Sequence, residues 1–168
     1  MAEQDFIGAQ AYLYVIKQIK NNLLESKLPD NFRRINTVTT GDISEVDLSK
    51  QTIFPLGHIM VNNVQFGDHI QTFNVSVMLM DILFEDNATE IPLIYNDDNE
   101  LFMLNKVLWI GNKMVKDFNV GNLNNGDIYV DINSVSAEPF KDRFENLLVG
   151  WVLTFNVQVR NNVDICLN

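Results

Sequence analysis

The sequence is nearly devoid of cysteine, because Cys166 is the only one among its 168 residues. A single thiol cannot close an internal disulfide, which excludes the disulfide-rich scaffolds of small secreted domains. The same usage is typical of a protein made in a reducing compartment.

Long apolar runs are also missing, since no stretch of about 18 consecutive apolar residues occurs. The first five residues, MAEQD, include two acidic side chains, whereas a secretory signal begins with basic residues and continues with an apolar segment. We therefore expect a soluble protein that is synthesised in a cytoplasm and has no membrane partner.

Basic residues are scarce: 12 Lys and Arg side chains stand against 22 Asp and Glu, for a formal net charge of −10. This charge provides no electrostatic attraction to nucleic-acid phosphates or to an anionic membrane surface. Direct nucleic-acid binding is therefore not expected, and the partners are predicted to be proteins.

The composition that remains is that of a globular protein. Hydrophobic residues make up 46% of the chain and charged residues 20%, well above the low hydrophobicity of disordered segments. A length of 168 residues is common for one domain. We predict a single domain over residues 1–168.

Two segments place apolar residues at the 3.6-residue spacing of an amphipathic helix. The first runs from Asp5 to about Ser26, and its expected buried arc contains Phe6, Ala9, Tyr12, Leu13, Ile16, Ile19, Leu23 and Leu24. The second runs from about Glu100 to Phe118, with a stripe of Leu101, Leu104, Val107, Leu108, Gly111, Val115 and Phe118. Gly111 lacks a side chain, so another element can approach the helix closely there.

Other segments alternate apolar and polar residues with the period of two that is typical of strands. They predict a strand at 33–40, a hairpin at 58–83 with its tip near 63–67, and strands at 128–133 and 151–159. Strands grouped in this way indicate an α+β fold, an antiparallel β-sheet with two helices packed on one face. Its core is expected to join both helices to Phe73, Val77, Trp151 and Phe155.

Motifs for catalysis and cofactor binding are absent. The eight glycines never adopt the spacing of a phosphate-binding loop, and no G-x-S-x-G sequence occurs. His58 and His69 could face each other across the predicted hairpin with Asp68 and Asp81 nearby, but a metal site needs a third ligand on a rigid support. The acidic segment 85–99 lacks the spacing of a calcium loop. We therefore expect no enzyme activity, no bound metal and no cofactor.

Large side chains on the polar faces of the two predicted helices are candidate interface residues. On the second helix, Trp109 and Phe102 lie seven residues apart among Asn and Lys side chains, and on the first helix Ile7 and Tyr14 repeat the pattern. Exposed aromatic and aliphatic side chains favour a subunit interface. Coverage by a loop or by the C-terminal tail of the same chain is an equally good explanation.

Two stretches of the sequence carry a family resemblance. The segment FPLGHIMVNN at 54–63 leads into FNVSV at 73–77, and EPFKDRFENLLVGW at 138–151 is followed by an alternating strand and by Asp164-Ile165-Cys166. Over most of residues 50–166, the chain resembles small virion proteins of tailed phages that infect Bacteroidetes, including crAss-like phages.

This resemblance implies a ring-forming subunit of the virion neck or tail, similar in fold class to tail terminators. Such proteins pair a small sheet with two helices and assemble as closed rings of six or twelve copies. The implied partners are copies of the chain itself and neighbouring portal, neck or tail proteins. The resemblance supplies no catalytic residues, and it does not separate a terminator from a neck adaptor or a neighbour of the tail tube.

Three hypotheses follow from the sequence. The first is a structural virion protein that forms a homo-oligomeric ring as a head-tail connector or tail terminator. The second is a soluble protein-binding adaptor that takes a peptide along an exposed strand. The third is a small metal-binding protein or enzyme centred on His58 and His69.

Overall fold

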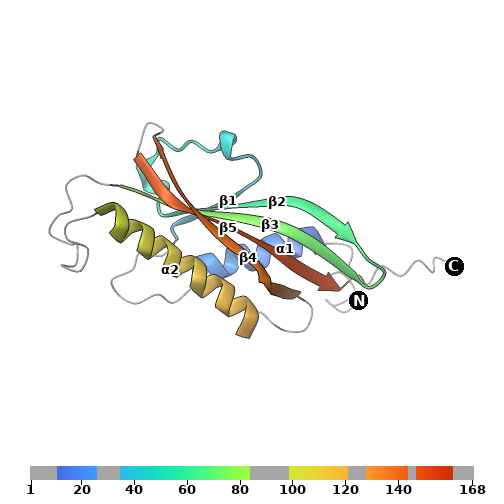
Figure 1. The fold of residues 1–168 in the computed structure, drawn as a ribbon. Helices are drawn as coiled ribbons and strands as arrows, with labels where there is room; N and C mark the ends of the chain where they lie inside the picture. The colour runs from blue at the N-terminus through green and yellow to red at the C-terminus, as the bar shows by residue number, and fades with distance from the viewer. Residues whose placement is uncertain (1–10, 26–34, 84–98, 121–127, 144–146, 161–168) are drawn as a thin grey trace.

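A computed structural model describes residues 11–25, 35–83, 99–120, 128–143 and 147–160. Its elements are two helices, α1 (Ala11–Glu25) and α2 (Asn99–Val120), and five strands, β1 (Thr37–Thr40), β2 (Leu56–Phe66), β3 (Ile70–Ile82), β4 (Ile128–Arg143) and β5 (Leu147–Arg160) (Figure 1). Two short 3₁₀ helices, η2 (Ile43–Glu45) and η3 (Gln51–Ile53), lie between β1 and β2. The predicted loop at 85–99 falls outside the described residues except for Asn99, which begins α2.

The strands form one five-stranded sheet in the order β1-β2-β3-β5-β4. Antiparallel pairing joins β2 to β3, β3 to β5 and β5 to β4, which confirms the predicted α+β class. The pair β1–β2 differs, because its strands run parallel. After β1 the chain passes through η2 and η3 and returns to the level of the start of β1, where β2 begins beside Thr37. Two parallel neighbouring strands require a crossover of this kind.

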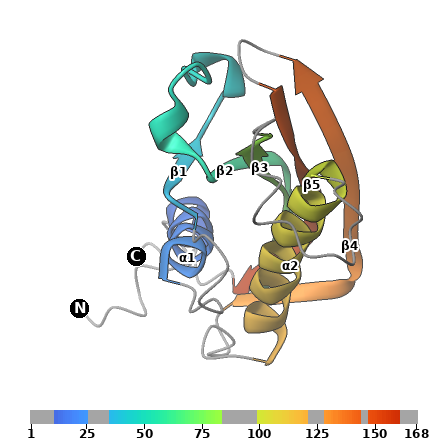
Figure 2. The same cartoon turned by 90° about the vertical axis from the view of Figure 1, so that its left-hand side faces the viewer.

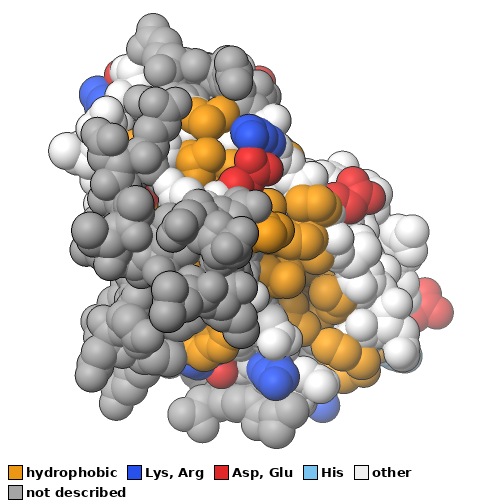
Figure 3. All heavy atoms as spheres, turned by 60° about the vertical axis from the view of Figure 1, so that its left-hand side comes forward, with side chains coloured by type: hydrophobic (Ala, Val, Ile, Leu, Met, Phe, Trp, Pro, Cys, Tyr) orange, Lys and Arg blue, Asp and Glu red, His pale blue; other side chains and the backbone are white. Residues whose placement is uncertain are grey.

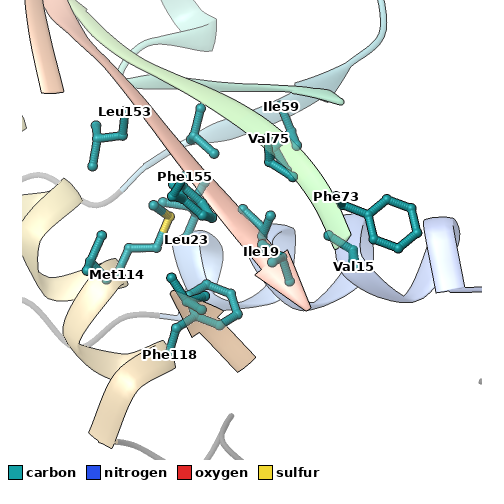
Figure 4. Close-up of a cluster of buried hydrophobic side chains, with 14 of the residues drawn as sticks. Val15, Ile19, Leu23, Ile59, Phe73, Val75, Met114, Phe118, Leu153 and Phe155 are labelled. Atoms are coloured by element: carbon teal, nitrogen blue, oxygen red, sulfur yellow. The ribbon is translucent and has the colours of Figure 1, made fainter. Parts of the chain in front are cut away.

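Both helices cover the same face of the sheet, as predicted (Figures 1 and 2). The main core lies between them and the alternate residues of the strands, where Phe73, Val77 and Phe155 are almost completely buried. Figure 4 shows this cluster, with Ile19 and Leu23 of α1 on one side and Met114 and Phe118 of α2 on the other. Trp151 is half-buried, and its Nε1–H donates a hydrogen bond of 2.9 Å to the carbonyl oxygen of Leu104 in α2.

The buried stripe of α1 differs from the predicted arc. Its fully buried residues are spaced four apart: Ala11, Val15, Ile19 and Leu23. Tyr12 and Leu13, which were predicted to be in the core, are instead 49% and 59% exposed. The run YLYVI at 12–16 is apolar on nearly every side of a helix, so its periodicity does not identify the inward face.

The stripe of α2 agrees better with the prediction. Val107, Gly111, Val115 and Phe118 are buried as expected, together with Ile110 and Met114. Leu101 at the start of the helix is exposed instead. No helix in the described ranges is both long enough and apolar enough to cross a lipid bilayer.

The opposite face of the sheet has a smaller core at one end. Phe54, Leu56, Met80, Ile82 and Leu148 are buried there. The chain between β1 and β2 covers them with Ile43, Val46, Leu48 and Ile53. Sequence periodicity did not predict this layer, because the covering segment contains no long element of its own.

The β2–β3 hairpin is confirmed, but its tip lies further along the chain than 63–67. Strand β2 continues to Phe66 through a bulge between Val61 and Asn63, and β3 begins at Ile70. Asn62 and Asn63 therefore belong to a strand, although Asn-Asn is typical of turns. The bulge accommodates the extra residue without ending the pairing.

At Gly111, α2 lies close against the sheet. A Cβ atom at this position would lie 2.8 Å from Leu153 Cδ2 and 3.3 Å from Leu79 Cδ1. Gly111→Leu should therefore push the helix off β5 and lower the free energy of unfolding by about 1–3 kcal/mol, as overpacked cores do. Denaturant melts would measure the loss, with exposed Lys116→Leu on the same helix as the control. Equal melting of both variants would contradict this packing.

Candidate functional site

The two histidines lie far apart, so the structure does not assemble the site predicted from them. His58 pairs with Met78 near the start of β2, whereas His69 lies in the turn at the other end of the hairpin. Phe66 lies eight residues after His58 in β2, which amounts to roughly 26 Å at the usual rise per residue. Asp81 is buried near the end of β3, away from the hairpin turn that holds His69. Its Oδ1 accepts a hydrogen bond from the Ile82 N–H.

In the described parts of the chain, no group of three or more His, Cys, Asp or Glu side chains is placed to hold a metal ion. Residues 85–98 of the acidic segment that raised the question of calcium lie outside those parts, and so does the single cysteine. The alternative centred on His58 and His69 therefore lacks the geometry it needs.

His58 instead joins β1 to β2. Its buried ring places Nε2 3.0 Å from the Gly41 carbonyl oxygen and Nδ1 2.8 Å from Thr39 Oγ1. A carbonyl only accepts, so Nε2 carries a proton, and in the neutral ring Nδ1 accepts a hydrogen bond from the Thr39 hydroxyl. Burial lowers the pKa of His58 below its ordinary value of 6.5, although the Gly41 hydrogen bond and the Asp42 carboxylate act in the opposite direction.

The lowered pKa of His58 predicts a loss of stability in mild acid. Below pH 6.5 the unfolded chain takes up a proton that the folded chain resists, so the free energy of unfolding should decrease as the pH falls. Melting temperatures between about pH 7.5 and 5.5, above the range where most carboxylates titrate, would measure this slope. His69→Asn should keep the slope and His58→Asn should lose it. An unchanged slope in His58→Asn would contradict the assignment.

The structure places three of the four predicted interface residues, since Ile7 lies outside the described residues. Tyr14 is half-buried against the main core. Phe102 is half-buried, and the Lys106 ammonium lies 4.9 Å from the centre of its ring. Trp109 is also half-buried and packs partly against the core, but it lines an open groove. Of these residues, Trp109 alone is placed on that groove.

This groove runs between α2 and β4 and has a volume of about 430 Å³. Its walls are mostly apolar, and they consist of Asn105, Leu108, Trp109, Asn112 and Val115 from α2, Ile132, Val135 and Ala137 from β4, and Leu153 from β5. Figure 3 shows a band of hydrophobic side chains on this side of the molecule, open to the viewer and flanked by polar atoms. We call this site the α2–β4 groove.

A bulge in β4 shapes the groove. The register of β4 on β5 shifts between Asp131 and Ser136, and Figure 2 shows the strand turning a corner along its length. Ser134 Oγ donates to the Asp131 carbonyl oxygen at 2.6 Å and accepts from the Asn156 N–H at 2.8 Å. The hydroxyl thus satisfies a backbone donor that the bulge removes from the ladder, while Ile132 and Val135 line the groove.

The other open face of the sheet carries a row of polar side chains. Asn62 Nδ2 donates to Asn74 Oδ1 and to Ser76 Oγ, both at 2.8 Å. Asn74 Nδ2 donates to Asn156 Oδ1 at 2.8 Å, and the hydroxyls of Ser76 and Thr154 lie 3.0 Å apart. These groups hydrogen-bond to one another across three strands, so this surface is stable in contact with water. Contact with a partner would remove more apolar surface from water at the α2–β4 groove than at this polar face.

Neither a protein-family model nor a curated protein matches this sequence. The chemistry of the groove therefore carries the functional argument. Its lining holds two amides and otherwise apolar side chains, which suits burial of another apolar surface.

Proposed function

We propose that this chain is a structural virion protein that forms a homo-oligomeric ring in the neck or tail of a tailed bacteriophage, as a head-tail connector or tail terminator. The observation that carries the proposal is the open apolar α2–β4 groove beside Trp109. An apolar surface left in water is a common mark of a protein–protein interface, and aromatic side chains are enriched at interface centres. The sequence resemblance to small phage virion proteins supplies the location.

The chemistry of the groove supports a role in assembly and not in catalysis. A general acid or base must lie within hydrogen-bond reach of a reacting group, and none of the groove's lining residues is ionisable. The acidic net charge of −10 favours protein partners over nucleic acid. The expected neighbours are copies of the chain and the adjoining portal, neck or tail proteins.

The strand edges favour a ring subunit over a peptide-binding adaptor. β4 is the outer strand on one side and contains Pro139, which has no N–H, as well as the bulge held by Ser134. On the other side, β1 pairs with β2 only as far as Ile59, and the exposed remainder of β2 is interrupted by the bulge at Asn62. Bulges and edge prolines both oppose the addition of a further strand.

A charge placed in the groove should block incorporation into particles. Ala137 is exposed and lines the groove, whereas the adjacent Ser136 is exposed on the opposite face of the same strand. Ala137→Glu should melt like the wild type but reduce its content in purified virions about tenfold or more, because the charge cannot be buried without a partner. Quantitative mass spectrometry of particles complemented with each variant would measure this.

Ser136→Glu is the matched control, since it adds the same charge one residue away and should be incorporated normally. Equal incorporation of both variants would show that the groove is not an interface. Absence of the wild-type chain from particles would refute the virion role itself.

A further inference from the structure

The tip of the β2–β3 hairpin presents an unusually exposed aromatic side chain. Phe66, the last residue of β2, is 80% exposed, and Ile70 at the start of β3 is 45% exposed. Burying one phenylalanine contributes on the order of 2–3 kcal/mol, so an aromatic ring held in water is a potential anchor for a partner.

The turn fixes the backbone from which this ring projects. The Gly67 N–H donates a hydrogen bond of 2.8 Å to the Ile70 carbonyl oxygen and closes the turn. A Cβ atom at Gly67 would lie 2.9 Å from that same oxygen, so the tight turn depends on glycine. A preorganised anchor loses little conformational entropy on docking.

We infer that the hairpin tip of one copy docks into the α2–β4 groove of the next copy, with Phe66 as the apolar anchor and Asp68 facing Lys116 at the groove rim. This inference rests on the proposed ring and names the surfaces that join its subunits. The groove matches the anchor in chemistry, because Leu108, Trp109 and Val135 present aromatic and aliphatic walls to an incoming ring.

The charges of the two surfaces are complementary. The turn carries Asp68, and Lys116 lies one helical turn beyond Asn112, which lines the groove. Both side chains are exposed, and neither forms an ion pair with the described residues. The neighbouring Lys113 is already paired with Asp117 at 2.7 Å, so Lys116 is the available lysine on this part of α2.

A single molecule cannot make this contact with itself. The hairpin is part of the sheet, and β5 separates it from β4, which forms the groove wall. Tip and groove are different surfaces, so each copy can offer its tip to one neighbour and its groove to another. Such a heterologous contact produces either a closed ring or a filament.

The contact is small, which guides the choice of experiment. A tip of about five residues buries less than the roughly 800 Å² per partner of a standard stable complex. The free chain should therefore remain mostly monomeric when dilute, and closure of the ring or an adjoining virion protein would supply the rest of the stabilisation. Disulfide trapping at high protein concentration can detect a contact of this kind.

The test uses a Cys166→Ser background with Asp68→Cys and Lys116→Cys together. Oxidation should convert this protein into a ladder of dimers, trimers and larger species on non-reducing gels, because each copy carries both halves of the contact. Either cysteine alone can give no species larger than a dimer. Asp68→Cys combined with Lys17→Cys on the exposed side of α1 is the mismatched control and should give no ladder.

Adding Phe66→Ala to the productive pair should reduce the ladder about tenfold or more without changing the melting temperature, because Phe66 is exposed in the monomer. A ladder that is equally strong in the mismatched control, or insensitive to Phe66→Ala, would overturn the docking arrangement. No ladder from protein that is nevertheless present as a ring in virions would refute the docking surfaces alone. A Phe66-dependent ladder from a chain absent from virions would support the docking and refute the phage function.

Discussion

The antiparallel pairing of β3 with β5 is the interaction on which the rest of the structure depends. It runs without interruption from Ile70↔Arg160 to Ile82↔Leu148, so it joins residues that lie 66 to 90 positions apart in the sequence. Alternate side chains of the two strands pack against both helices on one face of the sheet and contribute to the smaller core on the other face. Leu79, which pairs with Trp151, lies beside Gly57 and Gly111, where residues of α1 and α2 pack closely against the sheet.

Two local features beside this central pair shape the candidate interface. Gly111 lets α2 lie close over Leu153, and the bulge held by Ser134 bends β4 around the helix. Between them they leave the apolar groove with Trp109 and Val135 in its walls. Strand β4 is thus an edge strand that contains Pro139 and whose side chains line the groove. This arrangement favours contact of a partner with side chains over addition of a further strand to the sheet.

Much of the fold could be predicted from the sequence, because period and composition determine it locally. Two helices, the long hairpin and the β5 strand follow from apolar spacing, and the close approach at Gly111 follows from its place on a buried stripe. The parallel β1 could not be predicted in this way. Its orientation depends on a crossover of irregular chain, and irregular chain has no periodicity.

The candidate site was harder to predict, for reasons that individual residues illustrate. Trp109 was singled out because an aromatic side chain among Asn and Lys stands out. Phe66 fell inside the expected tip at 63–67, but its apolar character was not read as a sign of an exposed anchor. Uncertainty in register produced the false pairing of His58 with His69. Val135 and Ala137 were not singled out, because the predicted strand ended at residue 133 and the following SVSAEP at 134–139 contains a proline, which is rare inside strands.

The most direct test of the proposed function is the position of the chain in the virus particle. Electron microscopy of purified virions, labelled with gold-conjugated antibody to this protein, would measure that position. The proposal predicts label concentrated at the junction of head and tail or along the tail, with several copies on each particle. Label scattered over the capsid, or particles without label beside a strong signal in the lysate, would contradict it.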